Sequence, residues 1–288
     1  MTFTRITIIG TGLIGGSFAL AARRAGFTGH IIGCDRDNVL VRARDFGAID
    51  QAVVSPEEAV KGSDLIVLAT PVGSIIDLLE RIGPLVSPGA LITDVGSTKV
   101  EIMARARDVF GNDVANRFLP GHPMAGKEHC GVEYADADLF RDAVWLLTPF
   151  LGQDLAQPNI AAFTDLLRKI GARVLTFDPQ EHDRICALVS HLPQMISTAF
   201  ASTLVEELGD DPQAGAIGGR ALREMTRIAG SPYSMWRDIA LTNTKNIQDA
   251  LLKIEQKLAH IRENLRTREL EEEFEQAHRL GKKPTATS

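Results

Sequence analysis

The chain has 288 residues, of which 44% are hydrophobic and 24% charged, and these proportions exclude a disordered or fibrous protein. Its formal net charge of −6 argues against nucleic acid as the main partner, because no basic region dominates the sequence. An anionic ligand must therefore be bound by a local group of cationic side chains.

The sequence predicts a cytoplasmic protein with no membrane partner and no metal. Its first apolar run ends at Gly10, too early for the core of a signal peptide. No continuous apolar stretch approaches the roughly 20 residues that span a bilayer. The three cysteines, Cys34, Cys130 and Cys186, are odd in number and widely spaced, which disfavours a disulfide or metal framework.

Short β-branched runs alternate with helical patterns through residues 1–178. Most runs are apolar throughout, as expected of strands buried on both faces of a mostly parallel sheet. The expected strands are 5–9, 30–34, 65–69, 91–95, 117–119, 144–148 and 173–177, and the expected helices are 13–25, 38–46, 74–82, 99–109 and 159–170. This alternation is typical of a doubly wound α/β fold of the Rossmann type.

From residue 179 to the end, the sequence predicts a second, all-α domain. The expected helices are 180–208, 213–229, 232–242 and 243–275. In the last of these, apolar residues recur alternately four and three positions apart, as in a heptad repeat, at Ile247, Leu251, Ile254, Leu258, Ile261 and Leu265. Such a face either packs on the core of its own subunit or forms a subunit interface, and the pattern leaves both open.

A glycine motif predicts a dinucleotide site. Residues 10–15 have the pattern GxGxxG, directly after one strand and at the start of a helix, whose N-terminus can hold phosphates. Asp35 ends the next strand, where a carboxylate should bond the ribose hydroxyls and repel a 2′-phosphate. We therefore expect NAD rather than NADP, although Arg36 could soften that preference. The expected cofactor contacts are Gly10, Gly12, Leu13, Ile14, Gly15, Asp35, Thr70 and Pro71.

Two polar side chains follow neighbouring strands of the predicted sheet. Ser97 and His122 lie just beyond the strands that end near residues 95 and 119, at the edge where ligands bind to open parallel sheets. A dehydrogenase needs a base for a hydroxyl proton, and imidazole has a suitable pKa. The alternative for His122 is a loop histidine bonded to backbone. If His122 is the base, turnover should rise with pH through the ordinary histidine range.

Several sequence blocks are similar to the prephenate/arogenate (cyclohexadienyl) dehydrogenases of tyrosine biosynthesis. They are GSTK at 96–99, GHPMAG at 121–126, GVE at 131–133, SHLP at 190–193, TRIA at 226–229 and MWRD at 235–238. The resemblance implies oxidative decarboxylation, in which hydride passes from the substrate ring to NAD and the ring carboxylate leaves as CO2. It also implies a homodimer formed by the helical domain. Whether prephenate or arogenate is preferred, and whether tyrosine inhibits, stay open.

The resemblance assigns roles to individual positions. It implies that His122 bonds the ring hydroxyl with Ser97 beside it, and that His191 and Arg227 bind the substrate. Glu128 and Trp236 match residues that line the pocket. Glu224 departs from the family pattern, in which an aspartate is expected near the clamp arginine. His182 and Asp183 also match, but we assign them no catalytic role, because an acid in a first helical turn has an ordinary electrostatic explanation.

Two physical arguments agree with these roles. Pro193 inside an expected helix should kink it and change how His191 is presented. Arg220, Arg223 and Arg227 share one helical face, and one guanidinium is suited to clamping a dicarboxylate. Arg227 is the choice that the resemblance favours; the other two are expected on a solvated face.

Two alternatives remain. A β-hydroxyacid or imine reductase shares the plan of a Rossmann domain followed by helices, but such enzymes usually place a lysine where this chain offers His191. A non-catalytic NAD-sensing protein would have no need for Ser97, His122 and Arg227 together.

Overall fold

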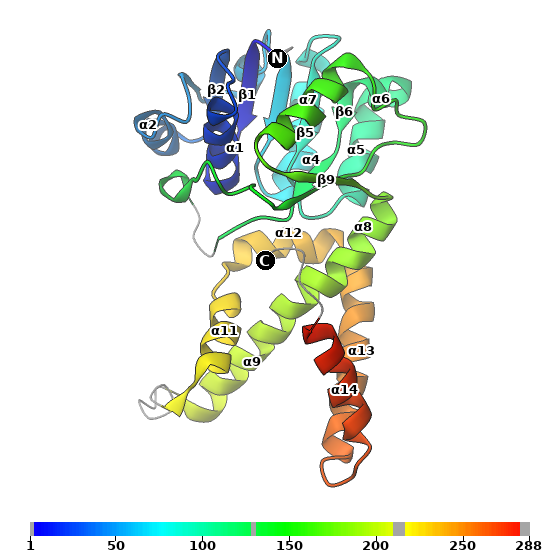
Figure 1. The fold of residues 1–288 in the computed structure, drawn as a ribbon. Coiled ribbons are helices and arrows are strands. Elements are labelled where there is room, and N and C mark those ends of the chain that lie inside the picture. The colour runs from blue at the N-terminus through cyan, green and yellow to red at the C-terminus, as the bar shows by residue number, and fades with distance from the viewer. Residues whose placement is uncertain (1–2, 128–130, 210–216, 283–288) are drawn as a thin grey trace.

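The computed structural model describes residues 3–127, 131–209 and 217–282. A sheet flanked by helices forms the upper part of Figure 1, in blue to green, and a group of helices from the second part of the chain lies below it. The carboxyl ends of the parallel strands point toward these lower helices. The boundary between the two parts is therefore where a ligand site of this fold class is expected.

The upper part contains a six-stranded parallel sheet in the order β3-β2-β1-β4-β5-β6. Its strands are β1 (Arg5–Ile9), β2 (His30–Cys34), β3 (Gln51–Val53), β4 (Leu65–Leu68), β5 (Leu91–Asp94) and β6 (Phe118–Leu119). Strand β1 pairs with both β2 and β4, so the strand order reverses at its carboxyl end. This order confirms the predicted Rossmann-type fold and puts the glycine motif at the reversal point.

Helices cover both faces of this sheet. They are α1 (Leu13–Arg24), α2 (Asp37–Asp45), α3 (Pro56–Ala59), α4 (Val72–Ile82), α5 (Val100–Phe110), α6 (Val114–Arg117) and α7 (Pro158–Lys169). Successive strand residues point to opposite faces, so Ile8 packs in a core with Phe18 and Phe163, whereas Ile9 packs in a second core with Leu79. The apolar runs of the sequence are explained by this burial on both sides.

A smaller sheet contains β7 (Gly121–Pro123), β8 (Val144–Leu147) and β9 (Arg173–Thr176) in that order. Strand β7 runs antiparallel to β8, and His122 pairs with Leu146. His122 was expected beyond a strand end, which was wrong, since it lies within β7; β3, α3 and α6 were not predicted. Segments of three or four residues, one of them containing glycine and proline, are too short to show a strand or helix periodicity.

The lower part is all-α, as predicted. It contains α8 (Pro179–Cys186), the π-helical turn η4 (Ala187–His191), α9 (Leu192–Leu208), α11 (Arg220–Ala229), α12 (Tyr233–Thr242), α13 (Thr244–Glu263) and α14 (Leu270–Gly281). The helix expected over 243–275 is divided into α13 and α14. Positions 213–216 of the helix expected over 213–229 lie outside the described residues.

The disturbance expected near Pro193 is the π-helical turn η4. Pro193 is the second residue of α9 and has no N–H to donate, and the wider turn ends two residues before it. His191 is the last residue of that turn and is buried. The helical run therefore continues through the proline while the backbone hydrogen-bonding pattern changes beside the histidine.

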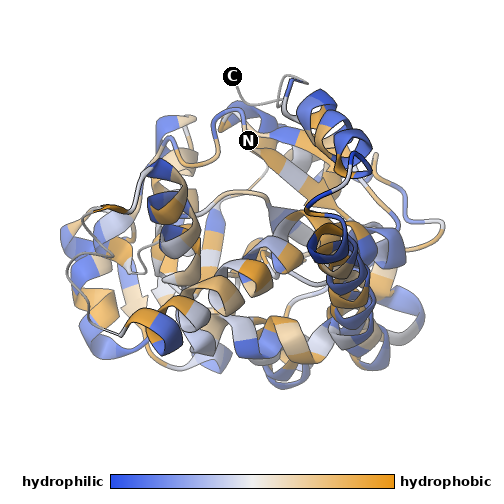
Figure 2. Ribbon diagram, turned by 90° about the horizontal axis from the view of Figure 1, so that it is seen from below, coloured by the Kyte–Doolittle hydropathy of each residue, from blue (hydrophilic) through white to orange (hydrophobic). Residues whose placement is uncertain are grey.

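By length and composition alone, the run Pro179–Leu208 could cross a membrane, since it has 30 residues and contains an 18-residue window with a mean hydropathy of 1.2. The run is not a continuous apolar stretch, however, because polar side chains interrupt it along its length. The first part of the run carries His182 and Asp183, both buried. On α9, by contrast, Phe200 and Val205 are exposed, and apolar stretches alternate with polar ones over the helices that face the viewer in Figure 2.

Helix α13 has two different halves. Ile247 is buried against Ala187 and Ile239 in a small core, with Leu251 packed beside it. Farther along the same predicted apolar face, Leu258 is more than half exposed. The beginning of this face thus packs on its own subunit, as one of the two alternatives required, whereas Leu258 and Leu265 farther along are exposed.

Candidate active site

The helical part is docked beneath the carboxyl edge of the large sheet by hydrogen bonds to two helix N-termini. Asp183 accepts from the backbone N–H groups of Lys99 and Val100, at 2.8 and 3.0 Å, where α5 begins. Asp238 of α12 accepts from Gly73 N at 3.0 Å, where α4 begins. A carboxylate at a helix N-terminus satisfies free N–H groups and complements the helix dipole. These contacts hold the helical part next to the sheet edge that carries Ser97 and His122.

A fully buried ion pair joins the loop that carries Ser97 to the strand that carries His122. The Lys99 ammonium contacts the Asp94 carboxylate and donates to Gly121 O at 2.6 Å. Asp94 also accepts from Gly96 N and Gly121 N, at 2.8 and 3.1 Å. Because each charge has several hydrogen-bond partners, the cost of burying the pair is offset. The end of β5, the loop with half-buried Ser97 and the start of β7 are thereby held as one unit.

His122 is buried in β7, and its Nδ1 lies 3.0 Å from Nε2 of His182. Burial lowers the pKa of His122 well below its ordinary value of 6.5, and the nearby charges of His182, Lys99 and His191 lower it further. The imidazole is therefore neutral at pH 7. It can accept a hydrogen bond from a ligand hydroxyl at that pH, which is what the predicted role requires.

His191 and Trp236 carry buried polar atoms without a partner among the described residues. His191 Nδ1 lies 3.2 Å from the amide nitrogen of Asn243, whereas its Nε2 and the Trp236 Nε1 are buried and unpartnered. The two rings lie edge to face, with centroids 5.8 Å apart. Burial lowers the pKa of His191 to about 4. Because buried polar groups are nearly always hydrogen-bonded, these two atoms indicate a place for a polar ligand group.

The glycine motif has the geometry of a dinucleotide cradle. Gly10 has φ +93°, and a Cβ there would lie 2.3 Å from Ala69 O; a Cβ on Gly15 would lie 2.0 Å from Gly10 O. A Cβ on Gly12 would meet nothing within 4 Å. Hence Gly10 and Gly15 are required by close backbone packing, whereas Gly12 leaves open space at the N-terminus of α1. No side chain caps that terminus, so its first turn, including Leu13 and Ile14, leaves N–H groups for phosphate.

Asp35 lies beside this loop at the end of β2. One carboxylate oxygen accepts from Thr11 N at 2.8 Å, and the other accepts from Arg36 N at 2.8 Å. The Arg36 side chain is 83% exposed. On the neighbouring strand end, the Thr70 hydroxyl is buried without a partner among the described residues, and Pro71 precedes α4. The residues of this edge fit a dinucleotide, with an acid placed for the ribose.

The chain matches family models over nearly its whole length. Residues 18–176 match "Prephenate dehydrogenase, nucleotide-binding domain", and residues 178–279 match "Prephenate dehydrogenase, dimerization domain". The chain belongs to the prephenate dehydrogenase family. This membership sets aside the β-hydroxyacid and imine reductases that the sequence left as an alternative.

Relatives within the prephenate dehydrogenase family agree. A prephenate dehydrogenase of Lactococcus lactis subsp. cremoris is 37% identical over 83% of this chain, and this chain spans 65% of that relative's length. A cyclohexadienyl dehydrogenase of Zymomonas mobilis is 32% identical over 84% of this chain and 81% of its own length. The crystal structure of prephenate dehydrogenase from Aquifex aeolicus, with hydroxyphenyl propionate and NAD+, aligns with a TM-score of 0.85 and 31% identity, over 98% of this chain and 97% of that one.

Not every residue assigned from the family resemblance lies beside His122 or His191. Arg227, in the last turn of α11, is half exposed, and its guanidinium pairs with Glu224 on the same helix at 3.1 Å. Glu224, the departure from the family pattern, is thus paired within its own subunit here. Glu128 lies outside the described residues. His191 and Trp236 are adjacent, with their ring centroids 5.8 Å apart.

Sequence reasoning missed the residues that support the predicted site. Asp94 is the last residue of an apolar strand and Lys99 belongs to the GSTK block, so a charged pair at 94 and 99 within an otherwise buried segment was the available signal. His182 was noticed and left without a role. Asn243, whose side-chain amide donates to Asp183 O at 2.8 Å, gave no signal in the sequence.

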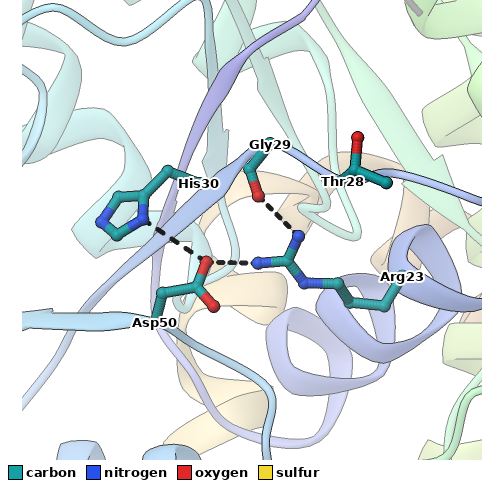
Figure 3. Close-up of a pocket in the computed structure, with 5 residues that line it drawn as sticks. All are labelled: Arg23, Thr28, Gly29, His30 and Asp50. Carbon is teal, nitrogen blue, oxygen red and sulfur yellow. Dashed lines mark hydrogen bonds and ion pairs between the residues drawn. The ribbon is translucent and has the colours of Figure 1, made fainter.

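A pocket elsewhere on this member of the prephenate dehydrogenase family is not part of the site. It lies at the amino end of β2, on the opposite edge of the sheet, and is lined by Arg23, Thr28, Gly29, His30 and Asp50. Figure 3 shows that Arg23 reaches both Asp50 and Gly29 O, and that His30 faces Asp50. These groups satisfy one another at the surface, so the pocket offers no converging free groups.

The buried pair of Lys99 and Asp94 predicts how substitutions change the free energy of unfolding. Lys99→Met leaves the Asp94 carboxylate buried without its cation, and removing one partner of such a pair costs roughly 3–5 kcal/mol. We expect the free energy of unfolding in urea to fall by about that amount. The double variant Lys99→Met/Asp94→Asn should lose less than the sum of the single losses.

The matched control is Lys61→Met, which removes an exposed pair with Glu58 and should change stability little. If Lys99→Met destabilised the protein no more than Lys61→Met, the buried pair would not have the structural role described here.

Proposed function

We propose that this chain is an NAD-dependent prephenate dehydrogenase that converts prephenate to 4-hydroxyphenylpyruvate and CO2, and that it also accepts arogenate. The observation that carries the proposal is a neutral, buried His122 at the sheet edge, with the glycine cradle at the same edge and the unpartnered His191 Nε2 in the adjoining helices. The printed names of the relatives support the same activity.

The reaction has a definite balance. Prephenate and NAD+ give 4-hydroxyphenylpyruvate, CO2 and NADH, and the ring becomes aromatic as the electrons of the bond to its carboxylate enter it. NAD, when bound, supplies the acceptor for the hydride that leaves C4. The product phenol keeps its proton, so no net proton is released. His122 therefore acts by accepting a hydrogen bond from the hydroxyl as positive charge develops there, and any proton that it takes up returns to the phenol oxygen.

The other residues bind and orient. Ser97, in the loop tied to the start of β7 through the ion pair, is proposed to contact the same hydroxyl. His191 Nε2 and Trp236 Nε1 are proposed to bond polar groups of the substrate, since both are otherwise unpartnered. Arg227 is proposed as the carboxylate clamp. Its pair with Glu224 is exposed, and such pairs contribute little, so a substrate carboxylate can replace Glu224 at small cost.

The proposed division of labour places NAD binding in residues 1–178 and substrate binding and dimerisation in residues 179–288. Asp35 supports NAD over NADP, because its carboxylate is fixed by two backbone N–H groups where a 2′-phosphate would have to lie. Cys34 and Cys186 are buried and unpaired, in accord with the reducing conditions of the proposed cytoplasmic location.

We also propose a homodimer formed through the helical part. Exposed large apolar side chains are frequent there, at Val189, Phe200, Val205, Leu241, Leu252, Leu258 and Leu265. Such exposure on one part of a protein marks an interaction surface. The matched family model describes this region as a dimerization domain, which supports a second copy as the partner.

The activity is tested by steady-state kinetics with prephenate and with arogenate, each with NAD and with NADP. We expect formation of NADH and 4-hydroxyphenylpyruvate from prephenate, and a clear preference for NAD. Asp35→Ala should narrow the gap between the two cofactors. Binding of NAD with no turnover of either ring substrate would instead support the non-catalytic sensor.

His122 generates the second test. His122→Asn should lower kcat by roughly 10²–10⁴, the usual contribution of general acid–base help, while KM for both ligands changes far less. Because its pKa lies well below 6.5, the neutral form persists through the ordinary histidine range. Turnover of the wild type should fall only as the pH drops through that lowered pKa. A decline centred at pH 6.5, or near-normal turnover in His122→Asn, would contradict this role.

Light scattering at micromolar concentration tests the dimer. Val205→Glu and Leu258→Glu place charges on exposed apolar positions of α9 and α13, so they should shift the protein toward monomer while leaving the fold intact. Val41→Glu, at an equally exposed apolar position on α2, is the control and should stay dimeric. A monomeric wild type, or dissociation by all three variants alike, would argue against an interface in the helical part.

A further inference from the structure

A chain of three buried side chains runs from the helical part into the sheet part. Asp183 Oδ1 lies 2.8 Å from His182 Nδ1, and His182 Nε2 lies 3.0 Å from His122 Nδ1. Asp183 and His182 are each only 1% exposed, and His122 is 8% exposed. Two of these residues come from α8 and the third from β7. Neither the activity proposed above nor the family resemblance gives His182 or Asp183 a role.

The direction of each hydrogen bond in this series follows from the contacts of Asp183. Backbone N–H groups can only donate, so the donations from Lys99 N and Val100 N make both oxygens of Asp183 acceptors. The nitrogen that faces Oδ1, His182 Nδ1, must then carry a proton. A neutral imidazole has one N–H, so His182 Nε2 is left with its lone pair. His122 Nδ1 must therefore be the donor to it, and His122 Nε2 keeps the free lone pair.

The opposite arrangement is unfavourable where His182 meets Asp183. It would set the lone pair of His182 Nδ1 against a carboxylate oxygen at 2.8 Å. Protonation of both histidines would place two further positive charges beside the buried Lys99 ammonium, with His191 also nearby. Asp183 and Asp94 are the acids next to this group, and Asp94 is already paired with Lys99. With Asp183 ionised and both histidines neutral, hydrogen bonds that all run from His122 toward Asp183 satisfy every group.

We propose that Asp183 and His182 are positioning residues, which hold His122 in the tautomer protonated at Nδ1 and so present its Nε2 lone pair to the substrate hydroxyl. The consequence for catalysis rests on the function proposed above; the tautomer itself does not. Because the two positioning residues lie on α8, the helical part determines the state of the base in the sheet part. Only the tautomer with a free Nε2 lone pair can accept a hydrogen bond from the substrate. Holding His122 in that tautomer keeps every enzyme molecule ready for turnover.

A metal ion is the competing use of the same atoms. His122 Nδ1, His182 Nε2 and Cys186 Sγ all lie within 4.8 Å of one another. A metal would need lone pairs on both nitrogens and a thiolate. Burial raises the pKa of Cys186 to about 12, which disfavours the thiolate, and the 3.0 Å separation of the two nitrogens is a hydrogen-bond distance. The experiment below therefore compares the protein before and after removal of metal ions.

The first measurement uses the ligand-free enzyme. Long-range ¹H–¹⁵N correlation spectra with ¹⁵N-labelled histidine report which ring nitrogen carries the proton, and His122→Asn and His182→Gln assign the two signals. We expect both residues protonated at Nδ1 at pH 7.5, before and after dialysis against EDTA. His122 protonated at Nε2, or a spectrum that changes on chelation, would overturn the proposal.

The second measurement uses a matched pair of variants with prephenate and NAD. Gln at position 182 can offer its side-chain oxygen near the place of Nε2, whereas Leu offers no acceptor. We expect His182→Leu to lower kcat by roughly 10–100-fold with KM within about threefold, and His182→Gln to recover most of that loss. His30→Gln, at a histidine on the opposite edge of the sheet, should match the wild type.

Equal losses in His182→Leu and His182→Gln, or a loss confined to KM, would contradict a positioning role. If the wild type turns over neither prephenate nor arogenate, the proposed function fails, and the spectra alone decide the tautomer. If it turns over prephenate while His122 is protonated at Nε2, the proposed function stands and this inference fails. Should His182→Leu not fold, the spectra of the wild type still decide.

Discussion

The buried pair of Lys99 and Asp94 is the interaction on which the arrangement of the site depends. Two segments that are separate in sequence meet at this pair: the end of β5 with the loop through Gly96, and the first residue of β7. A buried pair gives modest net stability, because desolvation opposes the Coulomb attraction. Its effect here is geometric, since the three backbone groups hydrogen-bonded to it, two of them on Gly121, hold the start of β7 in place. That placement sets the position of His122.

The same edge explains how the two parts of the molecule are joined. Parallel strands end together, and the helices that follow them leave N–H groups free at that edge. Asp183 and Asp238 from the helical part fill two such termini, at α5 and α4. The N-terminus of α1 has no such side chain and remains for a phosphate. One edge of the sheet thus serves both to attach the helices and to bind the cofactor, with different termini for each.

The sequence predicted the parts of this structure that depend on local pattern. The glycine spacing and the fully apolar strands identified the Rossmann-type sheet, because both arise from neighbours along the chain. Strand β7 was not predicted, since Gly121–Pro123 forms a strand only through its partner β8. His122 was predicted as a functional residue, but its neighbours Asp94, Lys99 and His182 were not. The charged residues at 94 and 99 were a local signal that was not used, whereas the contact of His122 with His182 joins residues 60 positions apart, and no spacing encodes it.

The π-helical turn η4 limits the insertions and deletions that this segment can accept. A π turn holds one residue more than the α-helical turn it replaces, so it is equivalent to a single inserted residue. Each residue turns an α-helix by about 100°, so such an insertion rotates everything after it by that angle relative to α8. Deleting any one of the residues 187–191 would restore a regular helix and swing the apolar side of α9 around its axis. Insertions and deletions should therefore be rarer here than in an ordinary helix of equal exposure, since one length change would alter the buried histidines and the outer face together.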